Sequence, residues 1–292
     1  MKRFFILASA AIVALASCAK TEVVYKDAPE EIAFKQITNV MTKADALSGS
    51  MGVYAYYNGA AYFDKTEFAI QAGETFWTAA SPKYWPVSGE VGFVMYAPFA
   101  ANVASTSITE LTFTKSAGNN DDLLYGTVTS GKTVNAVPVT LNHALTNVLV
   151  NVKGEASVTL VSVELLEVGD AGTGVVDFSN SKVIWTPTAV KNPVIYSTEQ
   201  TLSPTPISCT SCLVLPAEEL DAQQIRLTYK VEGSVGNLTY TTDSGVGTNV
   251  LGTKWESGKK YIYNITVGVE EIMFDADVAE WAAGNGADGE DL

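Results

Sequence analysis

The sequence predicts an all-β protein. Apolar residues recur at every second position, turn-forming residues separate these stretches at intervals of roughly ten residues, and helical periodicity is scarce. This spacing is typical of antiparallel β-sandwiches. The abundance of Val, Thr and Tyr fits the same class, because β-branched and aromatic side chains pack well on a pleated surface.

Four segments show the alternation most clearly. Their apolar positions are Val91, Phe93 and Met95; Val148, Val150 and Val152; Ile225, Leu227, Tyr229 and Val231; and Tyr261, Tyr263, Ile265 and Val267. Each pattern predicts a strand with one buried face and one face in water. Short helical turns are expected near Thr75–Ala80 and Ala217–Ala222.

The first residues have the form of a bacterial export signal. Lys2 and Arg3 precede a short apolar run, which is followed by Leu15-Ala16-Ser17-Cys18. This tetrapeptide matches the lipobox, in which the cysteine becomes the acylated first residue of the mature chain. The apolar run is too short for a lasting membrane span, so we expect lipid on Cys18 to be the anchor. The alternative is an ordinary signal peptide with an incidental cysteine.

The length suits two domains behind this signal, which spans residues 1–17. Residues 18–29 are polar and predict a tether. A polar stretch ending before Pro138 marks a boundary, which predicts an N-terminal β-sandwich at 30–133 and a C-terminal one at 134–281. Residues 282–292 are rich in Gly and Asp and predict a flexible acidic tail.

Composition excludes several functions. The formal net charge is −14, which repels the phosphates of nucleic acid. His143 is the only histidine, so a multi-histidine metal site is impossible and any catalytic triad would depend on this one residue. We therefore expect a packed structural histidine, no cofactor, no metal and no enzymatic activity.

Three other features have more than one interpretation. Cys209 and Cys212 are spaced for a local disulfide or for two buried free thiols, with a redox site less favoured. The run Asn119–Asp122 has oxygen ligands suited to Ca²⁺, but a solvated turn is the favoured interpretation. Aromatic residues crowd positions 54–85, where core packing is favoured over a face that binds a glycan or a protein.

Five motifs follow one another in an order that resembles the fimbrillin family of Bacteroidales. They are Phe76-Trp77 with 83–86 and 91–98, then 141–148, Leu213-Val214-Leu215-Pro216, 255–263, and 272–276 with 278–281. The resemblance implies two transthyretin-like Greek-key β-sandwich domains in tandem. It also implies an outer membrane lipoprotein of the cell surface that becomes a subunit of a pilus (fimbria).

The family's assembly mechanism implies specific sites. A protease removes the first strand, and a strand from a like subunit or another pilin fills the groove by β-strand addition. The removable strand would carry Ile32, Phe34 and Ile37, with cleavage after Lys43 and before Ala44. The donor strand would carry Ile272, Phe274, Val278 and Trp281, unless this run completes its own domain.

One departure from the family keeps a second function open. Cleavage in the best-known members follows an arginine, but no arginine lies between Arg3 and Arg226. Either the protease has a different specificity or the chain is never cut. An uncut chain would be a monomeric or pilus-tip lipoprotein adhesin that binds a host glycan or protein.

Overall fold

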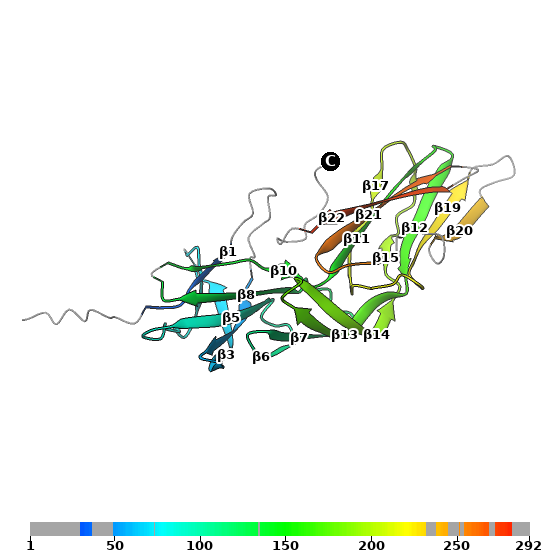
Figure 1. Cartoon of the computed structure of the whole chain (residues 1–292). Helices are drawn as coiled ribbons and strands as arrows, with labels where there is room; N and C mark the ends of the chain where they lie inside the picture. The colour runs from blue at the N-terminus through cyan, green and yellow to red at the C-terminus, as the bar shows by residue number, and fades with distance from the viewer. Residues whose placement is uncertain are drawn as a thin grey trace, which may run out of the picture.

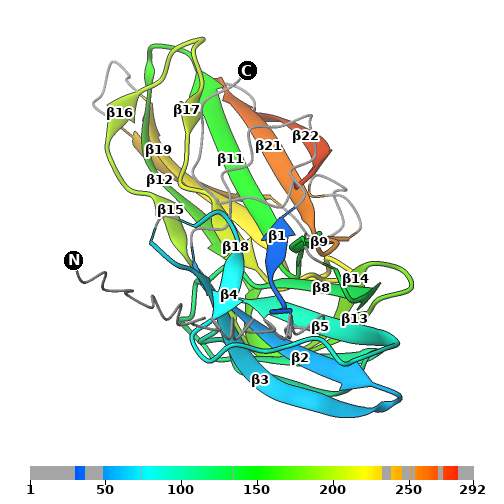
Figure 2. The same ribbon diagram turned by 90° about the vertical axis from the view of Figure 1, so that its left-hand side faces the viewer.

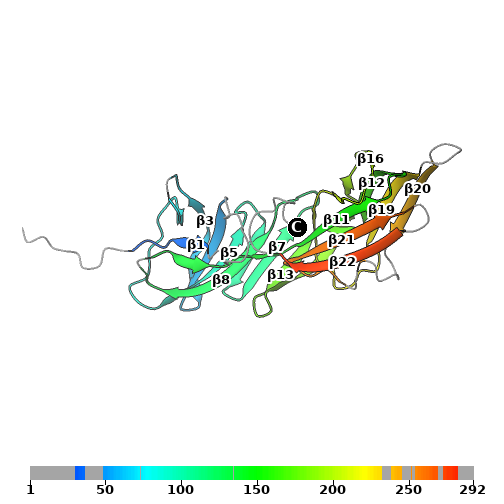
Figure 3. The same ribbon diagram turned by 90° about the horizontal axis from the view of Figure 1, so that it is seen from above.

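The computed structural model describes residues 30–36, 49–72, 74–133, 135–231, 238–244, 251, 254–268 and 272–281. Every regular element in these residues is a β-strand, which confirms the predicted all-β class. The strands form two sandwiches that lie end to end along the molecule (Figure 1, Figure 3). Within the described ranges, no helix has the length and apolar character of a membrane span.

The first sandwich contains an eight-stranded sheet. Its order is β10 (Asn142–His143), β8 (Leu124–Gly131), β5 (Glu90–Ala97), β2 (Met51–Tyr57), β3 (Ala60–Ile70), β4 (Trp77–Ala79), β1 (Phe34–Gln36) and β9 (Val137–Val139). Three strands, β2, β3 and β4, separate the strands that carry Phe34 and Phe93, yet the two rings lie only 5.1 Å apart. The sheet is therefore strongly curled. The curl encloses one hydrophobic core, to which Met51, Phe68 and Trp77 also belong.

A four-stranded sheet covers the opposite face of β2, β5 and β8. Its order is β14 (Lys182–Lys191), β13 (Val168–Asp177), β7 (Glu110–Lys115) and β6 (Val103–Ser107). Leu111 and Phe113 of β7 belong to the same core as Tyr96 and Tyr125 of the larger sheet. The eight-stranded sheet is therefore packed on both faces, which explains why β5 is buried along almost its whole length.

The second sandwich packs two sheets around a third core. One sheet contains β17 (Ile207–Ser208), β11 (Thr146–Gly154), β21 (Lys259–Val267) and β22 (Ile272–Glu280), with β18 (Cys212–Val214) also on β11. The other contains β15 (Val194–Tyr196), β12 (Val158–Leu166), β19 (Gln224–Val231) and β20 (Leu238–Ser244), with β16 (Gln200–Thr201) also on β12. The predicted alternation of β11 and β21 is confirmed, because their predicted apolar positions are buried in this core.

Two strand pairs depart from the expected antiparallel arrangement. β1 pairs in parallel with β9, and β11 pairs in parallel with β21. The other named pairs in the described residues are antiparallel. Parallel partners need a long crossover, so both pairs join distant parts of the chain.

Hydrogen bonding between strands crosses the point at which we expected a domain boundary. β9 and β10 follow residue 134 but pair with β1 and β8 of the first sandwich. The hairpin β13–β14 pairs with β7 and so belongs to the same sandwich. The division at residues 133 and 134 stays a prediction, and the four later strands β9, β10, β13 and β14 belong to the sheets of the first sandwich.

The two predicted helical turns are wrong. Residues 77–79 form β4 instead, and Trp77 of that strand is buried in the first core. Ala217 forms an isolated antiparallel bridge with Trp255. In both places, burial of an aromatic side chain and pairing of the backbone outweigh local helical preference.

An ion cluster ties the loop after β7 to β13 and β14. The Asp170 carboxylate lies 3.5 Å from Lys115 Nζ and 3.1 Å from Lys191 Nζ, and it accepts a hydrogen bond from the Gly118 N–H at 2.8 Å. Burial lowers the pKa of Lys115. Burial alone would raise the pKa of Asp170, but the hydrogen bonds from Gly118 and Lys191 and the charges of both lysines hold it below its usual value.

We predict that Asp170→Asn lowers the free energy of unfolding at pH 7 by about 3–5 kcal/mol, because it leaves the buried Lys115 ammonium without its counter-charge. Because the pKa of Asp170 is depressed on folding, its contribution is present above about pH 4 and is lost as the pH falls through the folded value. Urea unfolding between pH 3 and 7 measures both effects.

The exposed Asp221 provides the matched control for this prediction. Asp221→Asn makes the same chemical change outside the cluster, so we expect it to alter stability by less than about 0.5 kcal/mol. Equal effects of the two substitutions would contradict a specific role of the cluster.

Candidate functional site

The N-terminal strand is held at both backbone edges (Figure 2). On one edge β1 runs parallel to β9, and the Val137 N–H donates to the Ala33 carbonyl at 2.7 Å. On the other edge the Ile32 N–H donates to the Lys83 carbonyl at 2.7 Å. Without this strand, backbone groups on both sides would lose their partners.

Two side chains of this segment fill the first core. Ile32 and Phe34 are both fully buried, whereas Lys35 is exposed. The Phe34 ring meets the rings of Phe68 and Phe93 edge to face, with centroids 5.0 and 5.1 Å away. The segment is therefore an extended strand that places alternate apolar side chains in a groove.

The remaining predicted residues of this site lie outside the described residues. They are the lipidation residue Cys18, the third apolar strand residue Ile37, and the cleavage pair Lys43 and Ala44. In the sequence, the cleavage pair falls in the connection between β1 and β2. A cut there would leave β1 without a covalent connection to the rest of its sandwich.

The predicted donor segment is an edge strand of the second sandwich. β22 pairs antiparallel with β21 from Ile272 to Glu280, and β22 is the last strand of its sheet in the described residues. Ile272 is half-buried against the third core, whereas Val278 is 60% exposed. The side chain of Phe274 lies outside the described part of the structure. In this structure β22 thus completes the sheet of its own chain.

Trp281 ties the end of this strand to the first sandwich. Its ring stacks on the imidazole of His143, with ring centroids 3.6 Å apart and an interplanar angle of 8°. His143 is buried on β10, and its Nδ1 lies 2.8 Å from the Asp122 carboxylate. The single histidine is therefore a packed residue, as the sequence indicated, and the structure places it in a contact between the two sandwiches.

Both later cysteines are free and buried. Burial raises the pKa of Cys209 to about 12 and also raises the pKa of Cys212, although the nearby Lys191 charge opposes the second shift. Thiols of this kind are poor nucleophiles near neutral pH. Of the two alternatives that the sequence left open, a local disulfide and two buried free thiols, the structure has the free thiols.

The Asn119–Asp122 run has its side chains engaged within the protein. Asn119 Oδ1 accepts from the Asp121 N–H at 2.7 Å, and Asn120 Oδ1 accepts from Lys191 Nζ at 3.0 Å. The described residues contain no group of three or more His, Cys, Asp or Glu side chains that could hold a metal ion. In this structure the run is a turn whose amide oxygens bond to groups of the protein itself.

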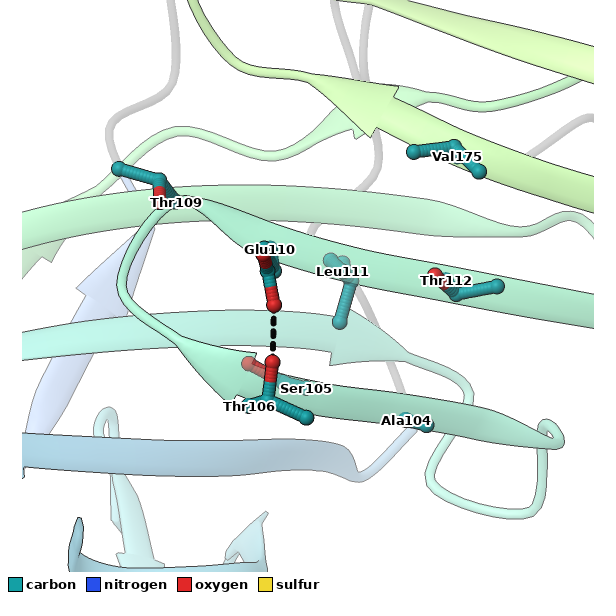
Figure 4. Close-up of a pocket in the computed structure, with 8 residues that line it drawn as sticks. All are labelled: Ala104, Ser105, Thr106, Thr109, Glu110, Leu111, Thr112 and Val175. Atoms are coloured by element: carbon teal, nitrogen blue, oxygen red, sulfur yellow. Dashed lines mark hydrogen bonds between the residues drawn. The ribbon is translucent and has the colours of Figure 1, made fainter.

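A hollow of about 310 Å³ lies at the β6–β7 hairpin, beside Val175 of β13 (Figure 4). Its lining is Ala104, Ser105, Thr106, Thr109, Glu110, Leu111, Thr112 and Val175. The Thr106 hydroxyl donates to the Glu110 carboxylate, and the Ser105 and Tyr56 hydroxyls share a hydrogen bond of 2.8 Å. The Thr106 and Ser105 hydroxyls and the Glu110 carboxylate therefore already have partners within the protein.

Sequence reasoning missed the parallel partner of the N-terminal strand. β9 has three residues and contains Pro138, so this stretch read as a linker. The available signal was the alternation of Val137, Val139 and Leu141, all of which are buried in the first core.

Comparison with known proteins finds one matching family model and several solved structures with a similar fold. A family model described as fimbrillin-like matches residues 36–281. No curated protein sequence is significantly similar to the chain.

Solved structures that share the fold include three from Bacteroides species. A fimbrial protein from Bacteroides vulgatus aligns with a TM-score of 0.62 at 14% identity, covering 86% of this chain and 99% of its own. A candidate cell adhesion protein from Bacteroides uniformis aligns with a TM-score of 0.61 at 20% identity and the same coverage. One from Bacteroides ovatus aligns with a TM-score of 0.57 at 14% identity, covering 88% and 100%.

We predict that Phe34→Ala lowers the free energy of unfolding by about 3–5 kcal/mol, because it opens a cavity between two aromatic rings in a fully buried place. Lys35→Ala on the exposed face of the same strand is the control and should have little effect. Thermal and urea unfolding of both variants provide the measurement. A stable Phe34→Ala protein would show that the strand contributes little to the core.

We also predict that Cys209 and Cys212 resist iodoacetamide in the folded protein at pH 7.5 and react in urea without added reductant. Burial and the raised pKa of each thiol explain the first result, and the absence of a disulfide explains the second. Mass spectrometry of a Cys18→Ser chain counts the adducts. Labelling in urea that appears after reduction alone would indicate a disulfide.

Proposed function

Because the chain belongs to the fimbrillin-like family, we propose that it is a structural subunit of a surface pilus that polymerises by strand exchange. As a family member it is a fimbrial-type surface protein and not an enzyme. The observation that carries the proposal is the seating of residues 30–36, which fill a groove with Ile32 and Phe34 and pair along both edges. A strand held in this way is replaceable by another strand of the same pattern.

The groove left by this strand has a defined chemistry. Its walls are the edges of β9 and β4, and its floor contains Phe68, Phe93 and Trp77. An incoming segment must therefore be extended and must place apolar side chains at alternate positions, with an aromatic or large aliphatic one at the place of Phe34. Backbone pairing supplies affinity, and the side-chain sites supply register.

Export and processing complete the proposed route. Acylation of Cys18 delivers the precursor to the outer membrane, and cleavage between Lys43 and Ala44 then releases the removable strand together with the lipid. The cut subunit is held in the fibre by its neighbours. We also propose that the chain has two transthyretin-like domains, at residues 30–133 and 134–281.

The segment from Ile272 to Trp281 is the proposed donor strand. It lies at the edge of its sheet, and most of its described side chains are exposed, so its exchange would disturb little of the third core. The positions 272, 274 and 278 alternate in the manner that the groove requires. Partner subunits are like chains or other pilins.

A second candidate function follows from the lysine at the cleavage position. Because Lys43 stands where the best-known relatives have an arginine, a chain that is never cut would keep its first strand and its lipid. It would then be a monomeric or pilus-tip adhesin that binds a host glycan or protein.

We predict that limited digestion of the purified precursor with a lysine-cleaving protease produces ladders on a denaturing gel run without boiling. Cleavage after Lys43 frees β1 to leave, and the open groove accepts a strand from another subunit. Mass spectrometry of the product identifies the new N-terminus at Ala44.

Lys43→Gln is the control, because it removes the cut and leaves the described residues unchanged. It should stay monomeric under the same digestion. A wild-type protein that is fully cut at Lys43 and still monomeric would contradict polymerisation by strand exchange. Residues 19–43 retained on native cells would favour the adhesin.

A further inference from the structure

One end of the first sandwich carries exposed apolar and aromatic side chains. The β2–β3 turn, the loop before β5 and the last residues of β8 meet at this end, because Tyr57 is opposite Val91 and Glu90 is opposite Gly131. Tyr62 is 39% exposed, Tyr84 is 43% exposed and Val87 is fully exposed. We call Tyr57, Tyr62, Tyr84 and Val87 the tip patch.

The tip patch is held in place by hydrogen bonds. The Tyr62 hydroxyl donates to the Tyr84 carbonyl at 2.7 Å, and the Tyr57 hydroxyl donates to the Ser88 carbonyl at 2.9 Å. The rings of Tyr57 and Tyr62 lie 6.0 Å apart. Because the hydrogen bonds hold these rings in place, binding at the tip patch would cost little side-chain conformational entropy.

The described chain begins beside this patch. Glu31 forms a backbone bridge with Tyr84, and the Trp85 N–H donates to the Glu30 carbonyl at 3.0 Å. Lys132 at the end of β8 lies 3.8 Å from the Glu30 carboxylate. The first described residue, Glu30, thus lies beside the tip patch.

The tether sets how far the tip patch can lie from a membrane. Residues 18–29 connect it to Cys18 and span at most about 40 Å when fully extended. A flexible chain of this length has an end-to-end distance of about 20 Å. A lipid on Cys18 therefore keeps the tip patch close to the bilayer, whereas the second sandwich extends from the other end of the molecule (Figure 3).

We propose that the tip patch rests on the bilayer that holds the lipid anchor, with its tyrosine rings at the headgroup layer and Val87 in the outermost acyl region. Tyrosine suits this layer because its ring is apolar and its hydroxyl is polar. The proposal rests on the lipid anchor of the proposed function and applies to the uncut precursor.

Charge favours a neutral lipid surface as the occupant. The formal net charge of −14 opposes binding to an anionic surface. At the tip, Lys132 is paired with Glu30, and Lys83 lies over the Phe63 ring. Attraction must therefore come from burial of the apolar side chains, and the lysine stems can extend their charges into the headgroups.

The experiment uses the full lipidated chain in phosphatidylcholine vesicles. Val87→Cys carries a polarity-sensitive fluorophore, and spin-labelled lipids quench it according to depth. Val278→Cys on the second sandwich is the matched control, since Val278 is also an exposed valine, with an exposed fraction of 60%. Cys209 and Cys212 are buried, so they should remain unlabelled at neutral pH.

We expect the label at position 87 to lie about 5–10 Å below the headgroup surface and the label at position 278 to stay unquenched. Adding Tyr62→Ser and Tyr84→Ser to the labelled chain should lower the ratio of docked to undocked protein at least about tenfold, because two rings no longer enter the interface.

Each other outcome overturns the proposal in a recognisable way. Protein that floats with the vesicles but shows no quenching at position 87 overturns docking and leaves the anchor intact. Protein that does not float overturns the anchor as well. A label at position 87 that is shielded before vesicles are added shows that the chain itself or another copy covers the tip patch.

Discussion

The first sandwich depends on the pairing of β1 with β9. These two short strands lie at one end of the eight-stranded sheet, and β9 has β1 as its partner in that sheet. On the same strand as this backbone pairing, Phe34 packs into the core against the rings of Phe68 and Phe93. Backbone pairing and core packing are thus joined in one segment of a few residues. Its loss opens an edge and a cavity together, which is a condition that a second strand can repair.

The fold class was predictable because burial of one face imposes a period of two on the sequence. Val148, Val150 and Val152 show this pattern, and they are all buried. Strand partners were not predictable in the same way. The parallel pairing of β1 with β9 and of β11 with β21 joins segments far apart in the chain, and alternation carries no information about which edge meets which.

The candidate site was predictable to the extent that its residues alternate. Ile32 and Phe34 read as one face of a strand, and both are fully buried. The other wall of their groove was not evident, because Pro138 makes β9 resemble a linker. The Asp170 cluster was also not predicted from the sequence, since its charges come from three different strands and the Gly118 N–H comes from a loop. Such a cluster exists only after the strands have paired.

The hairpin β13–β14 has a consequence for secretion. It completes the four-stranded sheet of the first sandwich, although residues 146–166 of the second sandwich precede it in the chain. A chain that emerges from an export channel N-terminus first cannot close this sheet until residue 191 has emerged. Until then the edge of β7 lacks its partner strand β13, and Phe113 lacks the Trp185 ring that stacks on it at 6.2 Å. The first sandwich is therefore completed only after the first strands of the second sandwich have followed it out of the channel.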